Sequence, residues 1–258
     1  KKNKKNFWKK NTLISWINYS MKENKTKGIL LYNKLSSENN LFLKFLTEDD
    51  EILTGISFGG STKKKKNIYQ LGYFLNLNIK IKNSNFPKNI SGELSKPYIY
   101  DIFIDKYKLH SLLSIVSLLN LSIIEGQKIK GLFESTNKII NFISSKENWL
   151  VDYFLYLLNL LKLIGYEIDF TNKLSFNYLN LDTLQFVNKN SNKSIVFPHN
   201  LLNKSVKINF ADVDSFFKIF EIILQNHHLN NMNLNIPTNY LKFKKIILGF
   251  LAKNEKNN

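Results

Sequence analysis

The chain contains no cysteine and no arginine, and each absence removes one kind of chemistry. Without cysteine there is no disulfide bond, no thiolate zinc site and no cysteine nucleophile within this chain. Because arginine is missing, all 37 basic residues are lysines. A lysine keeps the positive charge but lacks the planar fork with which arginine grips a phosphate or carboxylate. Any basic site here therefore relies on charge and not on bidentate hydrogen bonds.

A long, uninterrupted apolar run is also missing. The most apolar stretch, NWLVDYFLYLLNLLKLIGY (148–166), is broken by Asp152, Asn159 and Lys162. These polar side chains would be costly inside a lipid bilayer, whereas a buried helix of a globular protein carries such residues routinely. We therefore predict no transmembrane helix in this sequence.

The residues that are present can build a substantial core. The chain has 258 residues, 43% of them hydrophobic, which is enough for one large or two small domains. The net charge is +17, and residues 1–27 hold nine lysines and one acid, or +8 of that total. We expect residues 1–27 to form a basic, disordered tail, with a targeting or nucleic-acid-binding arm as the alternative. Met21 is a candidate for the natural start.

Between residues 28 and 104 the hydrophobic period is two, which predicts strands. The clearest strand is YFLNLNIKIK (73–82). Its apolar face is Leu75, Leu77, Ile79 and Ile81, and its polar face is Asn76, Asn78, Lys80 and Lys82. We expect SGELSKPYIYDIFI (91–104) to add one or two strands. Several short strands with turn residues between them favour a small closed barrel.

After about residue 105 the period becomes helical. Three segments fit amphipathic or buried helices before a less regular stretch at 170–205, which contains a predicted short strand or hairpin, and two more helices close the chain. The predicted helices are 108–126, 131–146, 147–166, 212–226 and 237–253. The sequence thus predicts an α+β fold in which a barrel precedes an all-helical domain at 105–258.

The segment FGGSTKKKKNIYQLG (58–72) combines glycines, hydroxyls and four consecutive lysines. Gly55 and Gly60 have the spacing of a phosphate-binding P-loop. That motif requires a lysine followed by serine or threonine and then a helix. Here Ser61 and Thr62 occupy those positions, and the next patterned segment is a strand. The sequence does not support a nucleotide site.

The same segment is better suited to gripping a nucleic-acid backbone. Lysines that meet phosphates release condensed counterions, a gain that carries no sequence preference, and aromatic rings can stack on bases of a single strand. The alternative is a solvated turn in a lysine-rich sequence, and the residues alone leave both open. The candidate nucleic-acid-binding residues are Lys63, Lys64, Lys65, Lys66, Tyr69, Tyr73, Lys80 and Lys82.

Other ionisable groups form no recognisable catalytic or metal site. The adjacent histidines His227 and His228 lack the i, i+4 spacing of two ligands on one helix face, and His110 and His199 stand alone, so we expect structural or surface roles. The acidic run 49–51 has the character of a turn. We predict neither an enzyme nor a cofactor nor a metal.

The order of these features resembles the RecO family of bacterial DNA repair and recombination mediators. An opening strand region is followed by a basic loop, a strand that begins at a Q-x-G turn, helices with an LLxxLGY-like signature, a hairpin region and a closing helix after a proline. The segments that carry the resemblance are 27–61, 62–81, 91–98, NLLKLIGYEIDF (159–170), 177–196 and LNIPTNYLKFKKIIL (234–248). Together they cover roughly residues 27 to 251.

This resemblance implies an OB-fold at residues 28–104 on the helical domain. It implies binding of single- and double-stranded DNA, annealing of complementary strands, and help in loading the recombinase RecA onto strands covered by single-strand-binding protein. The chain departs from the family in two respects. The four-cysteine zinc site of many relatives is excluded here, and Asn239 stands at or near the arginine of an L-P-x-S-R element.

The implied partners are RecR and the acidic tail of single-strand-binding protein, with RecA engaged indirectly, and the implied location is the bacterial cytoplasm, at the nucleoid. From charge and position we expect Lys242, Lys244 and Lys245 to edge a groove for the acidic tail, with a solvated helix face as the alternative. A second function class remains open, a structural nucleic-acid-binding protein of a ribonucleoprotein assembly. Affinity for single-stranded DNA compared with folded RNA would separate the two.

Overall fold

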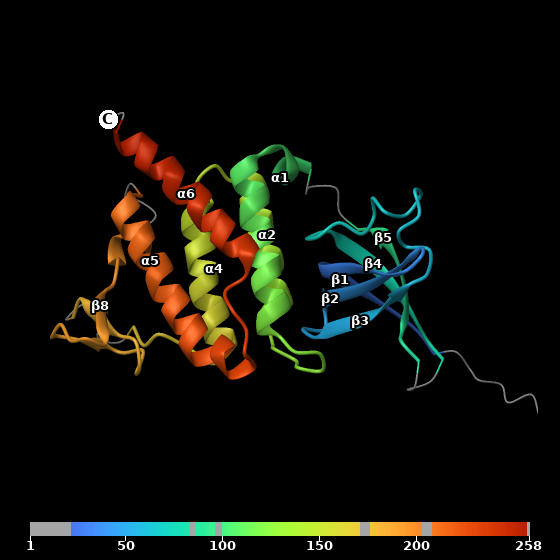
Figure 1. The fold of residues 1–258 in the computed structure, drawn as a ribbon, viewed down its shortest axis with the longest axis horizontal. Coiled ribbons are helices and arrows are strands. Elements are labelled where there is room, and N and C mark those ends of the chain that lie inside the picture. The colour runs from blue at the N-terminus through green and yellow to red at the C-terminus, as the bar shows by residue number, and fades with distance from the viewer. Residues whose placement is uncertain (1–21, 83–85, 96–99, 171–175, 203–207, 257–258) are drawn as a thin grey trace, which may run out of the picture.

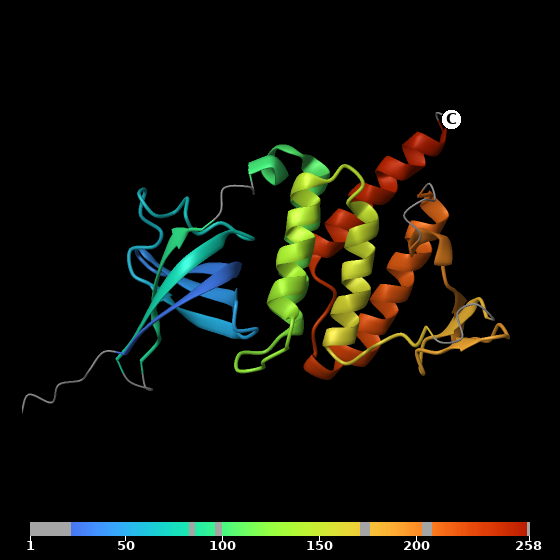
Figure 2. The same cartoon turned by 180° about the vertical axis from the view of Figure 1, so that it is seen from behind.

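The computed structural model describes residues 22–82, 86–95, 100–170, 176–202 and 208–256. A strand-rich N-terminal part lies beside a larger helical part, with α2 (Lys106–Ser122) and α3 (Leu132–Ser145) nearest the strands, as Figure 1 and the reverse view in Figure 2 show. The predicted α+β fold class is confirmed.

Five strands close into a barrel in the order β1-β2-β3-β5-β4. The long first strand pairs antiparallel with both β2 and β4, while β3 and β5 run parallel and join through one residue pair, Ile56 and Asn89. The strands are β1 (Lys22–Ser37), β2 (Asn40–Thr47), β3 (Ile52–Ser57), β4 (Phe74–Ile81) and β5 (Asn89–Leu94).

The alternation predicted for residues 73–82 decides which side chains of β4 fill the barrel. Leu75, Leu77 and Ile79 are buried, whereas Asn76 and Lys80 face solvent. Successive side chains of a strand point to opposite faces, so the apolar set is brought to the interior together. The buried interior cluster is Leu30, Leu43, Phe45, Leu53, Tyr69, Leu75, Leu77, Ile79 and Ile90.

Two sequence-based boundaries are wrong. Residues 22–27, predicted as part of a disordered tail, belong to β1 and pair with β4, with Lys22 opposite Ile81; residues 1–21 lie outside the described residues. Residues 100–104, predicted as strand, form the short helix α1 (Tyr100–Ile104). The barrel is already closed by the β1–β4 and β3–β5 pairs, so a further strand has no edge to pair with.

The Q-x-G turn that precedes β4 depends on its glycine. The backbone N–H of Tyr73 donates to Gln70 O at 3.1 Å, which closes the turn, and Gly72 has a φ of 82°. A side chain at Gly72 would also meet Leu112 of α2, since a Cβ there would lie 2.8 Å from its Cδ2. Glycine therefore allows both the turn and the close approach of the barrel to α2.

The helical part consists of α1 to α6 with a small sheet inserted. The remaining bounds are α4 (Leu150–Leu163), η1 (His199–Leu202), α5 (Phe210–Ile223), the π-helical η2 (Leu224–Leu229), η3 (Asn230–Met232) and α6 (Thr238–Lys256). The less regular stretch contains β6 (Tyr178–Asn180), β7 (Phe186–Val187) and β8 (Ser194–Val196), which pair in the order β7-β6-β8. None of the helices in the described ranges is long and apolar enough to cross a membrane.

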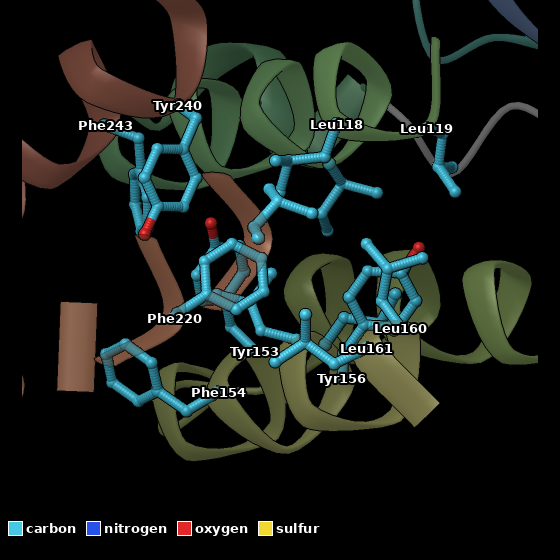
Figure 3. Close-up of a cluster of buried hydrophobic side chains, with 14 of the residues drawn as sticks. Leu118, Leu119, Tyr153, Phe154, Tyr156, Leu160, Leu161, Phe220, Tyr240 and Phe243 are labelled. Carbon is cyan, nitrogen blue, oxygen red and sulfur yellow. The ribbon is translucent and has the colours of Figure 1, made fainter. Parts of the chain in front are cut away.

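Aromatic side chains hold these helices together. Figure 3 shows residues of α2, α4, α5 and α6 pointing toward one another, with Tyr153 of α4 near the centre. The Tyr153 ring lies 4.8 Å from that of Phe243, between ring centres, and its hydroxyl shares a buried hydrogen bond of 2.7 Å with Ser114 Oγ. This bond satisfies the one polar group that Tyr153 brings into an apolar region.

Candidate nucleic-acid interface

The barrel presents one covered face and one open face. Ile29, Leu46 and Ile52 lie on the outside of β1, β2 and β3 and belong to the same buried cluster as the helices α2 and α3. The helical part therefore covers this side. Phe74 at the start of β4 is buried in the same cluster, but the rest of the outer face of β4 and β5 stays accessible, because Asn76, Lys80, Ser91 and Glu93 on it are exposed.

The lysine loop, residues 59–72, connects β3 to β4 and is held by its own hydrogen bonds. The backbone N–H of Gly59 donates to Asn40 Oδ1 at 3.0 Å, and Thr62 O accepts from the N–H groups of Lys65 and Lys66, both at 2.9 Å. All four lysines of the run 63–66 are exposed, and no ion pair joins them to another residue in the part of the chain that the structure describes. Their charges are therefore available to a polyanion.

Lys65 of the loop and Lys80 of β4 meet at one pocket. The pocket has a volume of about 190 Å³. Its lining residues are Ser57, Phe58, Lys65, Lys80, Asn89, Ile90 and Ser91. Lys63, Lys64 and Lys66 lie on the rest of the loop, outside this lining, and Lys82 is exposed just beyond the end of β4. The structure thus brings together two candidate residues that are 15 positions apart in the sequence.

The aromatic residues predicted to stack on bases are placed differently from the expectation. Tyr69 is only 2% exposed, and its hydroxyl accepts a hydrogen bond from Ser57 Oγ at 2.9 Å inside the barrel. A ring buried in this way cannot stack on a base, so the prediction for Tyr69 is wrong. Tyr73 is half-buried, and its ring packs edge-on against Phe103, with 5.5 Å between ring centres. Both tyrosines contribute to packing because the loop returns to the barrel at this point.

Sequence reasoning missed residues that lie on the open face. Phe58 is 54% exposed and lines the pocket. The alternation of β3 could have indicated its exposure. Ser57 is the last inward-facing position of β3, and successive side chains of a strand alternate, so Phe58 points outward. Lys25 and Lys27 of β1 are exposed opposite Asn78 and Asn76 of β4. They were missed because this segment was assigned to the tail.

Acidic residues reduce the positive charge of the open face of the barrel. Glu23 pairs with Lys80 across β1 and β4, and its Oε1 accepts a hydrogen bond from Asn78 Nδ2. Glu93 of β5, opposite Asn76, is also exposed. The strongest positive field therefore lies at the lysine loop and the adjoining pocket.

On the helical part, the three lysines expected to edge a groove differ in their exposure and in their contacts. Lys242 and Lys245 of α6 are exposed, but the Nζ of Lys244 lies 2.9 and 2.8 Å from the two carboxylate oxygens of Glu221 on α5. Lys244 is therefore part of an internal ion pair. Hollows of about 540, 420 and 390 Å³ on the helical part are lined by other residues.

The histidines have structural surroundings. The Nε2 of His227 lies 2.8 Å from Leu181 O, just after β6, and that of His228 lies 2.9 Å from Ser122 O, at the end of α2, so the two rings tie η2 to other parts of the helical domain. Burial, with help from Lys242 and Lys106, lowers the pKa of His110. Among the described residues, no group of three or more histidine, aspartate or glutamate side chains could hold a metal ion.

Comparison with known proteins points to one family. Residues 105–177 match the family model described as Recombination protein O C terminal. The chain is 30% identical over 153 residues to the DNA repair protein RecO of Rickettsia bellii strain OSU 85-389, which covers 56% of this chain and 59% of that protein. It is 26% identical over 142 residues to the DNA repair protein RecO of Jannaschia sp. strain CCS1, covering 55% of this chain and 58% of that protein. The match thus spans about three-fifths of the length of these curated relatives.

Proposed function

We infer that this chain, which belongs to the RecO family, acts in DNA repair and recombination by binding DNA without catalysing a reaction. The observation that carries the proposal is the meeting of Lys65 and Lys80 at one pocket on the open face of the barrel, beside three more exposed lysines. Lysines from a loop and a strand that converge on one surface form a path for a phosphate backbone.

We propose that the barrel is an OB-fold. Its strand order β1-β2-β3-β5-β4, closed by β1, agrees with a five-stranded Greek-key barrel of that kind. We place this domain at residues 22 to about 95 and the helical domain from residue 100 onward, because α1 packs with the other helices. The usual binding face of an OB-fold includes β2 and β3, but here the helical part covers much of that side. The exposed loop and the β4–β5 face are the alternative route for DNA.

The proposed mechanism is charge neutralisation followed by pairing. A strand bound along the lysine loop has part of its phosphate charge neutralised, so a complementary strand approaches with less repulsion and base pairing can nucleate. In the cell, at the nucleoid in the cytoplasm, this would support annealing and the loading of RecA onto strands covered by single-strand-binding protein. RecR and the acidic tail of single-strand-binding protein are the proposed protein partners. Lys242 and Lys245, without Lys244, are the proposed contacts for that tail.

A salt titration of DNA affinity tests this function. Replacing Lys63, Lys64, Lys65 and Lys66 with alanine should flatten the slope of log affinity against log salt by about 0.7 for each lost single-strand contact. Lys162→Ala is the control, because this exposed lysine lies on α4 in an ion pair with Glu167. An unchanged slope in the quadruple variant removes the loop from the mechanism, and tighter binding of folded RNA than of DNA would favour a ribonucleoprotein role.

A further inference from the structure

We propose that the pocket beside the lysine loop receives one unstacked base of a single DNA strand, with Phe58 as the surface on which that base stacks. The inference rests on the proposed function, because it names the part of the nucleic acid that this face takes. It concerns contact with a base and not contact with the phosphates, since Phe58 carries no charge.

Phe58 is an exposed aromatic residue on an ordered backbone. It follows Ser57, which is 1% exposed, and is itself 54% exposed. Two backbone hydrogen bonds hold the turn in which Phe58 lies. Gly60 N donates to Ser57 O and Thr62 N donates to Gly59 O, each at 3.2 Å. A ring carried on an ordered backbone loses less conformational freedom on binding than a ring on a mobile segment. Phe58 therefore has the features of a preformed stacking platform.

The remaining walls match the chemistry of a base. Asn89 and Ser91 of β5 add an amide and a hydroxyl beside the exposed apolar ring of Phe58. A base has flat apolar faces and a rim of hydrogen-bonding groups, so it needs both kinds of wall. Lys65 and Lys80 also line the pocket, where they can meet the phosphates on either side of the bound nucleotide.

The size of the pocket favours one base over a base pair. Its volume of about 190 Å³ is below the ~300 Å³ at which pockets for drug-sized molecules begin. In a duplex the faces of each base are covered by its neighbours, and extruding one costs unstacking and unpairing energy. The lysines attract both single and double strands through their phosphates. The pocket should therefore add affinity for single strands only.

The test compares Phe58→Ala with Phe86→Ala, a matched control. Phe86 is 60% exposed on the same barrel and is not part of the pocket lining. Removing a stacking aromatic should weaken binding of a single-stranded oligonucleotide about 5-fold or more. Binding of a blunt duplex and the salt slope should stay unchanged, because no phosphate contact is lost. Phe86→Ala should behave as wild type in each measurement.

Two further variants separate stacking from simple apolar contact. Phe58→Trp should retain single-strand affinity, whereas Phe58→Leu should lose most of what Phe58→Ala loses. A fluorescent base analogue in the oligonucleotide should show stacking with wild type and Phe58→Trp only. If wild type binds single strands with a lysine-dependent salt slope and all Phe58 variants match it, the pocket inference fails and the proposed function stands. If wild type binds no DNA, both fail.

Discussion

The carboxylate of Asp50, in the turn between β2 and β3, accepts a hydrogen bond of 2.7 Å from the backbone N–H of Gly131 at the start of α3. Its second oxygen accepts from Phe133 N at 2.9 Å. Gly131 has no side chain to cap the helix, so a residue of the barrel supplies the cap from 81 positions away. The acidic turn that looked like a simple loop in the sequence thus joins the two parts of the molecule.

A lysine of the barrel makes the complementary contact at another helix. The Nζ of Lys44 on β2 donates to Asn120 O at 2.6 Å and to Ile123 O at 3.1 Å, at the C-terminal end of α2. The helix dipole favours an acid at an N-terminus and a base at a C-terminus. Each contact therefore places a charge at the helix end whose dipole attracts it. Together the two contacts fix how the barrel, and so its basic face, is oriented on the helical part.

Substitutions at Asp50 should lower stability in a defined order. Asp50 has a φ of 64°, which asparagine and glycine tolerate better than alanine. Asp50→Asn keeps one acceptor, Asp50→Gly loses both, and Asp50→Ala loses both and adds backbone strain. We expect Asp50→Ala to cost about 2 kcal/mol, more than Gly, and Gly more than Asn. Urea unfolding measures the series, with the exposed Asp49→Ala as control; equal loss at both positions would contradict the cap.

Lysines of β1 should contribute to DNA affinity. Lys25 and Lys27 are exposed on the strand next to β4, so Lys25→Ala with Lys27→Ala should reduce the single-strand salt slope by up to about 1.4 in total. Stability should hardly change, because surface substitutions of this kind are usually within about 0.5 kcal/mol of neutral. A slope equal to that of wild type, measured in parallel with Lys162→Ala, would confine the interface to the loop.

Substitutions of Lys244 and of its neighbours on α6 should have different effects, the first on stability and the others on partner binding. Lys244 and Glu221 are about 20% exposed, and both carboxylate oxygens accept from the lysine. Lys244→Met should therefore lower the free energy of unfolding by about 1.5 kcal/mol. Lys242→Ala with Lys245→Ala should leave unfolding unchanged and weaken binding of a synthetic acidic peptide. If instead Lys244→Met leaves stability intact, the ion pair has no structural role.

Alkaline pH should destabilise the fold through its buried tyrosines. Burial raises the pKa of Tyr153, Tyr156 and Tyr240 well above the usual value. The unfolded chain loses these protons near pH ~10 while the folded chain keeps them, so stability is full below that pH and falls as pH rises above it. Each group adds a slope of about 1.4 kcal/mol per pH unit.

The double variant Tyr153→Phe with Ser114→Ala tests this, because it removes the phenol without leaving its buried partner unpaired. Urea unfolding between pH 8 and 12 should show a shallower decline than wild type. Lys44 has the opposite effect on stability. Because burial lowers its pKa, the folded chain releases this proton at a lower pH than the unfolded chain does, and stability rises with pH there. This is the effect of one group against that of three tyrosines. A decline as steep as that of wild type would show that Tyr153 ionises in the folded state.

The periodicity of apolar residues predicted those elements whose buried and exposed faces depend only on residues close together in the sequence. The alternation along β4 and the helical spacing along α4 each depend on residues within a few positions, and both elements formed as predicted. Residues 22–27 were misassigned because their partner strand, β4, lies about 50 positions away. Tyr69 was misread because the irregular loop has no period that distinguishes inward from outward positions.

By itself, the sequence determined the order of a strand region and a helical region, the apolar and polar faces of the regular elements, and the presence of four adjacent lysines in a loop. Only the tertiary structure decided that Lys65 meets Lys80, that Phe58 and not Tyr69 faces solvent, and that Asp50 caps α3. The physical reason is that face and period follow from the geometry of one chain segment. A shared pocket or an inter-domain cap depends on how the barrel closes and where the helices pack.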